Sequence, residues 1–439
     1  MVHGPTLPAR LLEAAHASEA AALDAGLTFF DVVFEMLDAA DVNAVAAYGG
    51  FPVRYASWRF GMEYERLARG HDWGLSKIYE LVINHDPTIA YLVRSNTLLE
   101  QKLVMAHVFG HADFFRNNAW FAPTERRMLE RFDEHARRVQ THVDARGPDV
   151  VERFLDAALS LEPLIDPYGP MKRSRAASVA QISAAERGRR ALEALCGGDD
   201  VPVEAPQRSP FDVMRFLLEH APLEAWERDL LSIVADEAEY FLPQRMTKII
   251  NEGWASFWHS RLLTTGLLEA SEVVDFADCH SGATSTAPGR LNPYKLGIDL
   301  FRHAERAGLD LFRLRAVHND VSFVDEVLDE AFIARSSLFV REESRGDARI
   351  GTREPEAVKA ELLRSLAWGG APRIRLDGTD GGVFTLRHEH DGRDLELDDA
   401  GEMLRTIERL WRGPTRLLSH EKGEPCELHC ERGELRLAG

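Results

Sequence analysis

Hydrophobic residues recur every three or four positions through most of the first 345 residues, as they do in helices with one buried face. Helix-capping and helix-breaking residues support this interpretation, because Ser76 is a good N-cap, Pro148 suits a first helical position, and Pro87 follows a predicted helix end. From 264 to 293 the chain is loop-like. We therefore expect helices over the following segments: 7–48 (two helices), 76–86, 96–117, 148–162, 211–241, 243–263 and 294–332.

The pattern changes after about residue 345, where apolar and polar residues alternate between Gly and Asp turns, as in hairpin strands. One amphipathic helix, AGEMLRTIERLW, is followed by more strand-like segments. The sequence therefore predicts a mainly α fold, with a multi-helix core over 1–345 and a small α+β C-terminal domain over 346–439. Residues 172–208 are poor in large apolar side chains and rich in basic, small, Gly and Pro residues, which predicts an exposed insert or linker.

Composition excludes several classes of protein. The chain has 439 residues with 52 basic and 71 acidic side chains, a net charge of −19, which argues against nucleic-acid binding. Four cysteines exclude a disulfide scaffold and fit a reducing compartment. No segment approaches the ~20 apolar residues that span a bilayer, and the N-terminus lacks a secretory signal pattern. We therefore expect a cytoplasmic protein without a membrane span. No GxGxxG or P-loop motif occurs, so a nucleotide cofactor is not expected.

The predicted helix LLEQKLVMAHVFGHADFFRNN carries His107 and His111, four residues apart. On a helix they lie about 40° apart on one face, within reach of a single ion. Leu103 and Phe114 share that face, so both imidazoles should point into the interior, where rings without a partner are costly. The alternative is two core histidines bonded to backbone or acidic groups. The metalloprotease motif HExxH is absent, because Val108 stands where its glutamate would be.

A second predicted helix, PQRMTKIINEGWASFWHSRLL, carries Glu252 and His259 two turns apart on one face. Their separation of about 10 Å along the helix means that one could bind a metal while the other supports it or acts as a base, or that an ion could lie between them. The alternative is that Asn251 and Glu252 satisfy a buried Lys or Arg. Gly253 is unfavourable in a helix by roughly 1 kcal/mol, which indicates that another part of the chain approaches closely there.

Together the two helices predict a metal centre. The predicted ligands are His107, His111 and His259. Three imidazoles with a neighbouring carboxylate suit zinc, and manganese or iron are alternatives. Glu252 is the predicted catalytic base, which would remove a proton from metal-bound water. Three residues are held in reserve: Glu237, Glu65 and His280. The corresponding function is a metal-dependent hydrolase acting on an amide or peptidoglycan-like substrate.

Long contiguous motifs in this chain resemble the SpoVR (stage V sporulation protein R) family. The resemblance covers nearly the whole chain except its ends and the 172–208 insert, and the loop ADCHSGATSTAPGRLNPYKLG follows the family less closely. The motifs that carry it are DWGLSKIYELVINHDPTIAYLVRSNTLLEQKLVMAHVFGHADFFRNN, ERFLDAALSLEPLIDPYG, EYFLPQRMTKIINEGWASFWH, LNPYKLG, RAVHNDVSFVDEVL and LRHEHDGRDLELDDAGEMLRTIERLW.

The resemblance implies a physiological setting rather than a reaction. SpoVR-like proteins are associated with spore-cortex formation, and also occur in non-sporulating bacteria in stress or stationary-phase settings. They often occur alongside a serine-kinase-like protein and a von Willebrand-type-domain protein. The second functional hypothesis is therefore a non-catalytic regulatory or assembly protein that acts with the kinase-like partner. The acidic surface and the separate C-terminal domain also favour this alternative.

Overall fold

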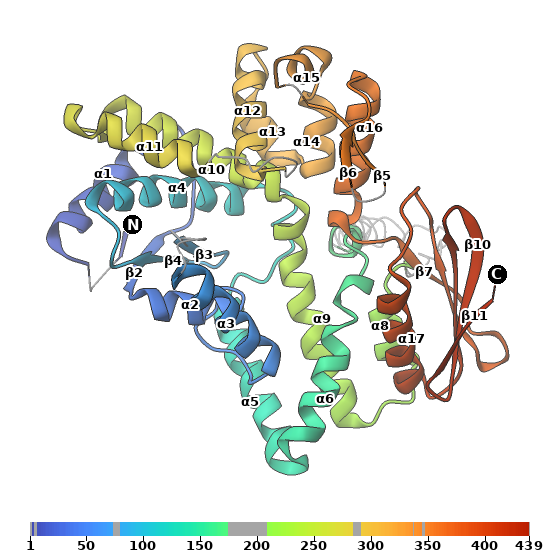
Figure 1. Cartoon of the computed structure of the whole chain (residues 1–439). Coiled ribbons are helices and arrows are strands. Elements are labelled where there is room, and N and C mark those ends of the chain that lie inside the picture. Colours follow the sequence, from blue (N-terminus) through green and yellow to red (C-terminus); the bar gives the residue numbers. More distant parts are fainter. Residues whose placement is uncertain are drawn as a thin grey trace, which may run out of the picture. The chain divides into compact units, whose positions relative to one another are not determined.

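The computed structural model groups the chain into two units. It describes residues 2–3, 7–72, 80–173, 209–283, 291–336, 338–344 and 347–438. Unit 1 comprises Met1–Glu152 and Pro243–Gly369, and unit 2 comprises Arg153–Leu242 and Gly370–Gly439. The division into domains at residue 345 stays a prediction, and residues 174–208 of the expected insert lie outside the described residues. The mainly α fold with an α+β C-terminal part is confirmed (Figure 1).

Unit 1 contains a four-stranded sheet that the sequence analysis missed. Its strand order is β1-β2-β4-β3, with β3 antiparallel to β4 and the other pairs parallel. The strands are β1 (Val2–His3), β2 (Val32–Leu37), β3 (Glu80–Ile83) and β4 (Thr88–Val93). The prediction of helix at β2 and β3 was wrong, because short apolar runs fit either element and the pairing with β4 decides between them.

Helices α4 (Leu98–Asn117) and α10 (Lys248–Leu262) pack together in the core of unit 1, and α10 also packs against α12 (Pro293–Arg306) (Figure 1). The start of α4 is fixed by a capping box between Thr97 and Glu100, and the predicted helix over 96–117 is confirmed. The remaining helices of eight or more residues here are α1 (Ala9–Asp24), α2 (Ala39–Ala47), α3 (Trp58–Asp72), α5 (Met128–Arg146), α11 (Val273–Ala283), α14 (Asp320–Val327) and α16 (Pro355–Leu366).

Two predicted boundaries near the core helices were wrong. The predicted helix end at 241 and the predicted start at 243 both lie inside α9 (Ala225–Met246), which contains Pro243. The helix is interrupted at Thr247 instead, before α10 begins at Lys248. Asp320 in α14 fixes the start of α10, because its carboxylate accepts hydrogen bonds from the N–H groups of Ile249 and Ile250 at 3.0 and 2.9 Å. The expected loop over 264–293 contains α11, whose end supplies His280 to the site described below.

Short elements complete unit 1. Helices α13 (Leu311–Val317) and α15 (Glu330–Ser336) follow α12, and an antiparallel hairpin joins β5 (Arg341–Ser344) to β6 (Asp347–Ile350). Helix α6 (Pro148–Leu159) begins at the proline that the sequence indicated and crosses from unit 1 into unit 2. Within the described part of the chain, no helix has the length and apolar character needed to cross a membrane.

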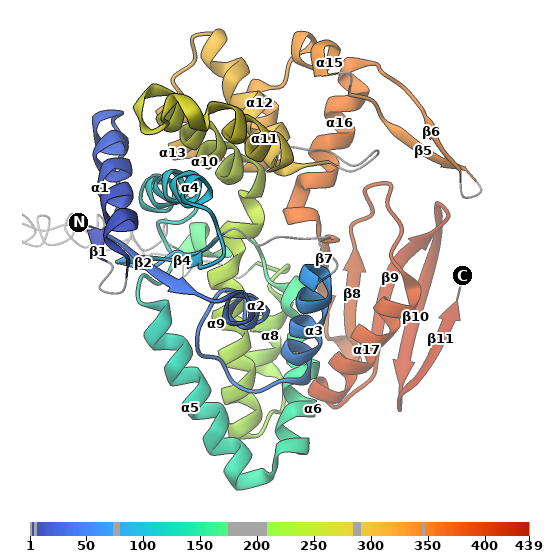
Figure 2. The same ribbon diagram turned by 60° about the vertical axis from the view of Figure 1, so that its left-hand side comes forward.

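Unit 2 is built on a five-stranded sheet in the order β11-β10-β9-β8-β7 (Figure 2). Only β8 and β9 pair in parallel, and α17 (Leu397–Trp411), which links them, packs against β9 and β10. The predicted alternation of strands with one helix is therefore confirmed. The strands are β7 (Ile374–Gly378), β8 (Phe384–His388), β9 (Thr415–Glu421), β10 (Glu424–Glu431) and β11 (Glu434–Ala438).

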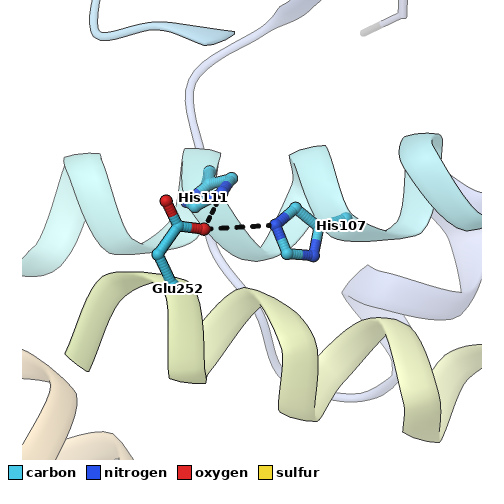
Figure 3. Close-up of side chains that lie close together, drawn as sticks. All are labelled: His107, His111 and Glu252. Carbon is cyan, nitrogen blue, oxygen red and sulfur yellow. Dashed lines mark ion pairs between the residues drawn. The ribbon is translucent and has the colours of Figure 1, made fainter. Parts of the chain in front are cut away.

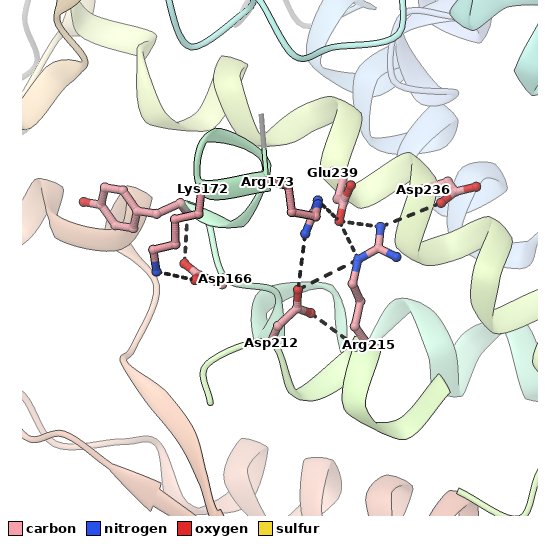
Figure 4. A network of polar contacts seen from close by, with 8 residues as sticks. Asp166, Lys172, Arg173, Asp212, Arg215, Asp236 and Glu239 are labelled. Atoms are coloured by element: carbon pink, nitrogen blue, oxygen red, sulfur yellow. Dashed lines mark hydrogen bonds and ion pairs between the residues drawn. The ribbon is translucent and has the colours of Figure 1, made fainter. Parts of the chain in front are cut away.

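A network of charged side chains connects α8 with α9 in the helical part of unit 2 (Figure 4). Arg173 and Arg215 both contact Glu239 of α9, at 2.6 and 2.5 Å. Asp212 caps α8 (Val213–His220) by accepting a hydrogen bond from the N–H of Arg215. Burial raises the pKa of Asp212 to about 6, against the opposing effect of that hydrogen bond and of the Arg215 charge. The network thus holds α8 to α9 through charges that are partly removed from water.

Candidate metal centre

The two histidines of α4 lie together on a buried face of the helix, as their spacing predicted, and this face lies against α10. His107 and His111 have 3% and 6% of their surface exposed, and Glu252 projects toward them from α10 (Figure 3). Asp113, on the same helix, fixes α4 against its neighbours. Its carboxylate accepts a hydrogen bond from Trp254 Nε1 at 2.8 Å and pairs with Arg315 at 3.0 Å. Burial raises the pKa of Asp113 to about 6.

Glycine and alanine let the helices approach closely around these side chains. A Cβ atom on Gly110 of α4 would lie 2.6 Å from the Ala255 Cα of α10. A Cβ on Gly253 would lie 2.5 Å from the Gly297 Cα and carbonyl carbon of α12. Real Cβ atoms do not come this close to backbone atoms. The close approach that Gly253 indicated is therefore confirmed, and Glu252 is the residue next to it on α10.

One ligand atom from each of His107, His111 and Glu252 lies within 4.8 Å of the other two. Glu252 Oε2 is 3.6 Å from His107 Nε2 and 3.4 Å from His111 Nε2 (Figure 3). Charged N–H···O hydrogen bonds are shorter, at about 2.7–2.9 Å. Two ligands of one tetrahedral zinc ion, each about 2.0–2.1 Å from the metal, lie about 3.3 Å apart. The observed separations therefore match shared coordination better than direct hydrogen bonding.

The other nitrogen of His111 is held by α10. His111 Nδ1 lies 2.9 Å from Asn251 Oδ1, and an amide oxygen can only accept, so Nδ1 carries the proton. A neutral imidazole protonated at Nδ1 has its lone pair on Nε2, the atom that faces Glu252. Metal-binding histidines have this arrangement, with one nitrogen donating to an outer partner and the other free to ligate.

His107 is held in a similar way by His259. Their Nδ1 atoms are 2.8 Å apart, a hydrogen-bond distance shorter than the separation of two ligands on one ion. His259 Nε2 is in turn 3.0 Å from His280 Nδ1. Burial lowers the pKa of His259 well below its usual value, and the neighbouring His107 and His280 add to this, so its imidazole is neutral. His259 thus contacts the cluster through the His107 nitrogen that does not face Glu252.

The carboxylate of Glu252 is ionised in this setting. Burial by itself would raise the pKa of Glu252, but positive charge and N–H groups on His107 and His111, when these imidazoles are protonated, outweigh burial and lower the pKa below the usual range; a cation held between the three side chains would supply positive charge in the same place. Glu252 Oε2 is buried and makes no hydrogen bond of normal geometry to any described residue. A buried, ionised oxygen that faces two imidazole nitrogens is a suitable ligand for a cation.

Of the three reserve candidates for the metal centre, one lies next to the cluster and two lie outside it. His280 joins the cluster indirectly, through His259. Glu65 is an exposed residue of α3, and Glu237 is a fully buried residue of the unit 2 part of α9; neither belongs to the three-residue cluster. The sequence analysis missed Asp320, which caps the helix that carries Glu252. No local signal marks this role, because Asp320 lies 71 positions from Ile249 in the sequence.

Fold and site together describe a mainly helical protein with a buried two-histidine, one-glutamate cluster between interlocked helices. The sequence pattern described as "SpoVR like protein" matches residues 7–371. The chain therefore belongs to the SpoVR family, as its motifs predicted. It is 33% identical over 289 residues to the uncharacterized protein YcgB of Escherichia coli (strain K12). The match covers 58% of this chain and 56% of that protein, so the chain spans about half of that relative's length. No solved structure matches the chain.

Proposed function

We propose that His107, His111 and Glu252 bind one divalent metal ion, with zinc as the first choice. The observation that carries this proposal is the position of Glu252 Oε2, 3.4 and 3.6 Å from two imidazole nitrogens. Asn251 and His259 support it from behind, because each holds the outer nitrogen of one ligand. Without a cation, the lone pair of His111 Nε2 would face a carboxylate oxygen, which is electrostatically unfavourable.

The alternative of core histidines bonded to an acid explains less of the geometry. It requires a protonated imidazole next to Glu252, and such a pair normally closes to about 2.7–2.9 Å. Neither imidazole does so, although α4 and α10 are close enough to bring Gly110 against Ala255. The space between the three ligand atoms is therefore maintained by the packing of the helices.

We further propose that the site supports a metal-dependent hydrolase acting on an amide or peptidoglycan-like substrate in sporulation or stress physiology. A zinc ion with three protein ligands keeps one position for water and lowers the pKa of that water to about 7. Glu252 presents Oε2 to both imidazoles, and the two dashed ion pairs in Figure 3 leave its other oxygen out. That second oxygen is our candidate to accept the proton, which retains Glu252 as the base.

Metal analysis of the purified full-length chain, grown and reconstituted with zinc, tests the metal centre. We expect about one ion per chain, loss of the ion in His107→Ala and Glu252→Gln, and retention in His85→Ala. His85 is a matched control because it is equally buried and pairs with Glu130, away from the cluster residues. A folded wild-type chain that stays metal-free after reconstitution would refute the proposal. Hydrolysis of peptidoglycan-derived amides by the zinc-loaded wild type, and its absence in the metal-free Glu252→Gln chain, tests the activity.

The burial of both imidazoles favours a second candidate function. Structural zinc sites are closed to solvent, and His107 and His111 are almost completely covered. In this alternative the ion stabilises the contact between α4 and α10, and the chain acts in the cytoplasm as a regulatory or assembly protein. Its partners would be the serine-kinase-like and von Willebrand-type-domain proteins. Zinc-dependent stability without hydrolysis, together with zinc-dependent binding of the purified kinase-like protein, would favour this function over the hydrolase.

A further inference from the structure

A second site lies in unit 2, and it is independent of the metal centre. A cavity of about 430 Å³ opens between the chain that follows α6, the start of β7 and the first turns of α17. This volume lies in the range of small-molecule pockets, about 300–1,000 Å³. Its apolar wall is formed by side chains from all three segments, including Leu164, Ile374 and Met403. The cavity therefore offers a compact apolar surface to a ligand.

A buried histidine lines this cavity. His388, the last residue of β8, is only 5% exposed, and its Nδ1 lies 3.1 Å from Ser419 Oγ. Its Nε2 has no hydrogen-bond partner among the described residues and is not fully covered by protein atoms. Burial, and then the neighbouring His390, lower the pKa of His388, so the ring is neutral at physiological pH. His388 can therefore offer one polar atom to a ligand inside the cavity.

The charged groups around the cavity leave an excess of acid. Arg393 is neutralised by Asp391 at 2.6 Å, and Asp394 pairs with His390 at 2.9 Å. Glu396 and Asp399, which also line the cavity, form no ion pair with any residue that the structure describes. The single cationic side chain of the lining is thus already paired, while two carboxylates are not. An anionic ligand would be repelled and a cation attracted.

We propose that this cavity binds a small organic amine, with its ammonium group at Glu396 and Asp399 and a compact apolar body against Leu164 and Met403. The two carboxylates supply charge complementarity, and the apolar wall excludes water from the body of the ligand. His388, which also lines the cavity, favours a ligand that carries a further polar atom for its Nε2. A divalent metal is a poorer occupant, because no three metal-ligating atoms of these described residues lie as close together as those of the metal centre.

Calorimetric titration of the full-length chain with phenethylamine, and with the matched neutral 2-phenylethanol, tests the proposal. Exposed ion pairs contribute up to about 1 kcal/mol each, so we expect the amine to bind about five- to tenfold more tightly than the alcohol. The double variant Glu396→Gln/Asp399→Asn should abolish this preference. The control Asp398→Asn removes one negative charge next to Asp399, in the first turn of the same helix but outside the cavity lining. It should change the affinity less than about twofold.

A second variant separates binding in the cavity from attraction to an acidic surface. Met403→Lys places a cation at the cavity wall, and amine binding should be lost while the circular dichroism spectrum and melting temperature stay close to those of the wild type. Equal affinity for amine and alcohol, equal effects of Asp398→Asn and the double variant, or unchanged binding in Met403→Lys would each overturn the proposal. So would the absence of saturable binding up to about 10 mM amine. If Met403→Lys unfolds, the amine–alcohol comparison and the double variant Glu396→Gln/Asp399→Asn still test whether the cavity binds the amine.

Discussion

Replacing Gly253 by alanine tests how the metal centre is assembled. The added methyl group would lie 2.5 Å from the Cα and carbonyl carbon of Gly297 and 2.8 Å from its oxygen. Ordinary contacts to a Cβ are 3.4–4 Å, so the two helix backbones must separate by about 1 Å. A flexible side chain cannot absorb the change, because the three nearest atoms all belong to the backbone of Gly297 in α12. Glu252, the adjacent residue, has to move with α10.

In Gly253→Ala, the destabilisation from overpacking is expected to exceed the stabilisation from the higher helix propensity of alanine. Alanine is favoured over glycine in a helix by about 1 kcal/mol. Overpacking a buried contact costs about 1–3 kcal/mol, and a contact between two backbones belongs at the upper end. We therefore expect Gly253→Ala to lower the free energy of unfolding by about 2 kcal/mol. Metal sites tolerate ligand shifts of only about 0.2 Å, so zinc affinity should fall at least about tenfold.

Denaturant unfolding and competitive zinc titration measure both effects. Gly61→Ala is the matched control, because Gly61 is exposed in α3 and a Cβ there meets no atom within 4 Å. This control should be as stable as the wild type or up to about 1 kcal/mol more stable. If Gly253→Ala behaves like Gly61→Ala, with unchanged zinc affinity, the close helix contact does not exist in solution and the reasoning fails.

Three further predictions concern the residues that support the site and unit 2. Asn251→Ala removes the acceptor for His111 Nδ1 and should lower zinc affinity about 10- to 100-fold without removing a ligand, measured by competitive titration. Asp320→Ala leaves two buried N–H groups at the start of α10 without partners and should cost about 2–4 kcal/mol in denaturant unfolding. The raised pKa of Asp212, about 6 in the fold, means that the native state binds more protons than the unfolded state between about pH 4 and pH 6. The contribution of Asp212 to stability therefore decreases as pH rises through that window, by about 1–3 kcal/mol, and Asp212→Asn should remove this slope from the pH dependence of unfolding.

Each of these predictions has an outcome that contradicts it. Complete loss of the ion in Asn251→Ala, as in His107→Ala, would mean that Asn251 does more than orient His111. If Asp320→Ala is no less stable than Asp320→Asn, which keeps one acceptor oxygen, the carboxylate does not cap α10. Parallel pH profiles for the wild type and Asp212→Asn between pH 4 and 7 would show that the aspartate titrates normally in the fold.

Local periodicity predicted much of the helical core and of the C-terminal sheet. The helix over 96–117 and its inward histidines follow from a four-residue spacing and a capping box, both of which are local in sequence. Strand β2 was not predicted, because Val32–Leu37 is too short to show which period its apolar residues follow. Its partner β4 lies 56 positions away in the pairing of Val32 with Thr88, and only that pairing makes it a strand.

The sequence by itself determined which side chains share a face of each helix: His107 with His111, and Glu252 with His259. The tertiary structure decided which of them meet, because His111 and Asn251 are 140 positions apart and no local rule relates them. It also decided which nitrogen of each ring faces Glu252 and which is held from behind. These choices depend on the close approach of α4, α10 and α12 at Gly110, Gly253 and Gly297. Packing of whole helices sets that approach, and helical periodicity does not encode it.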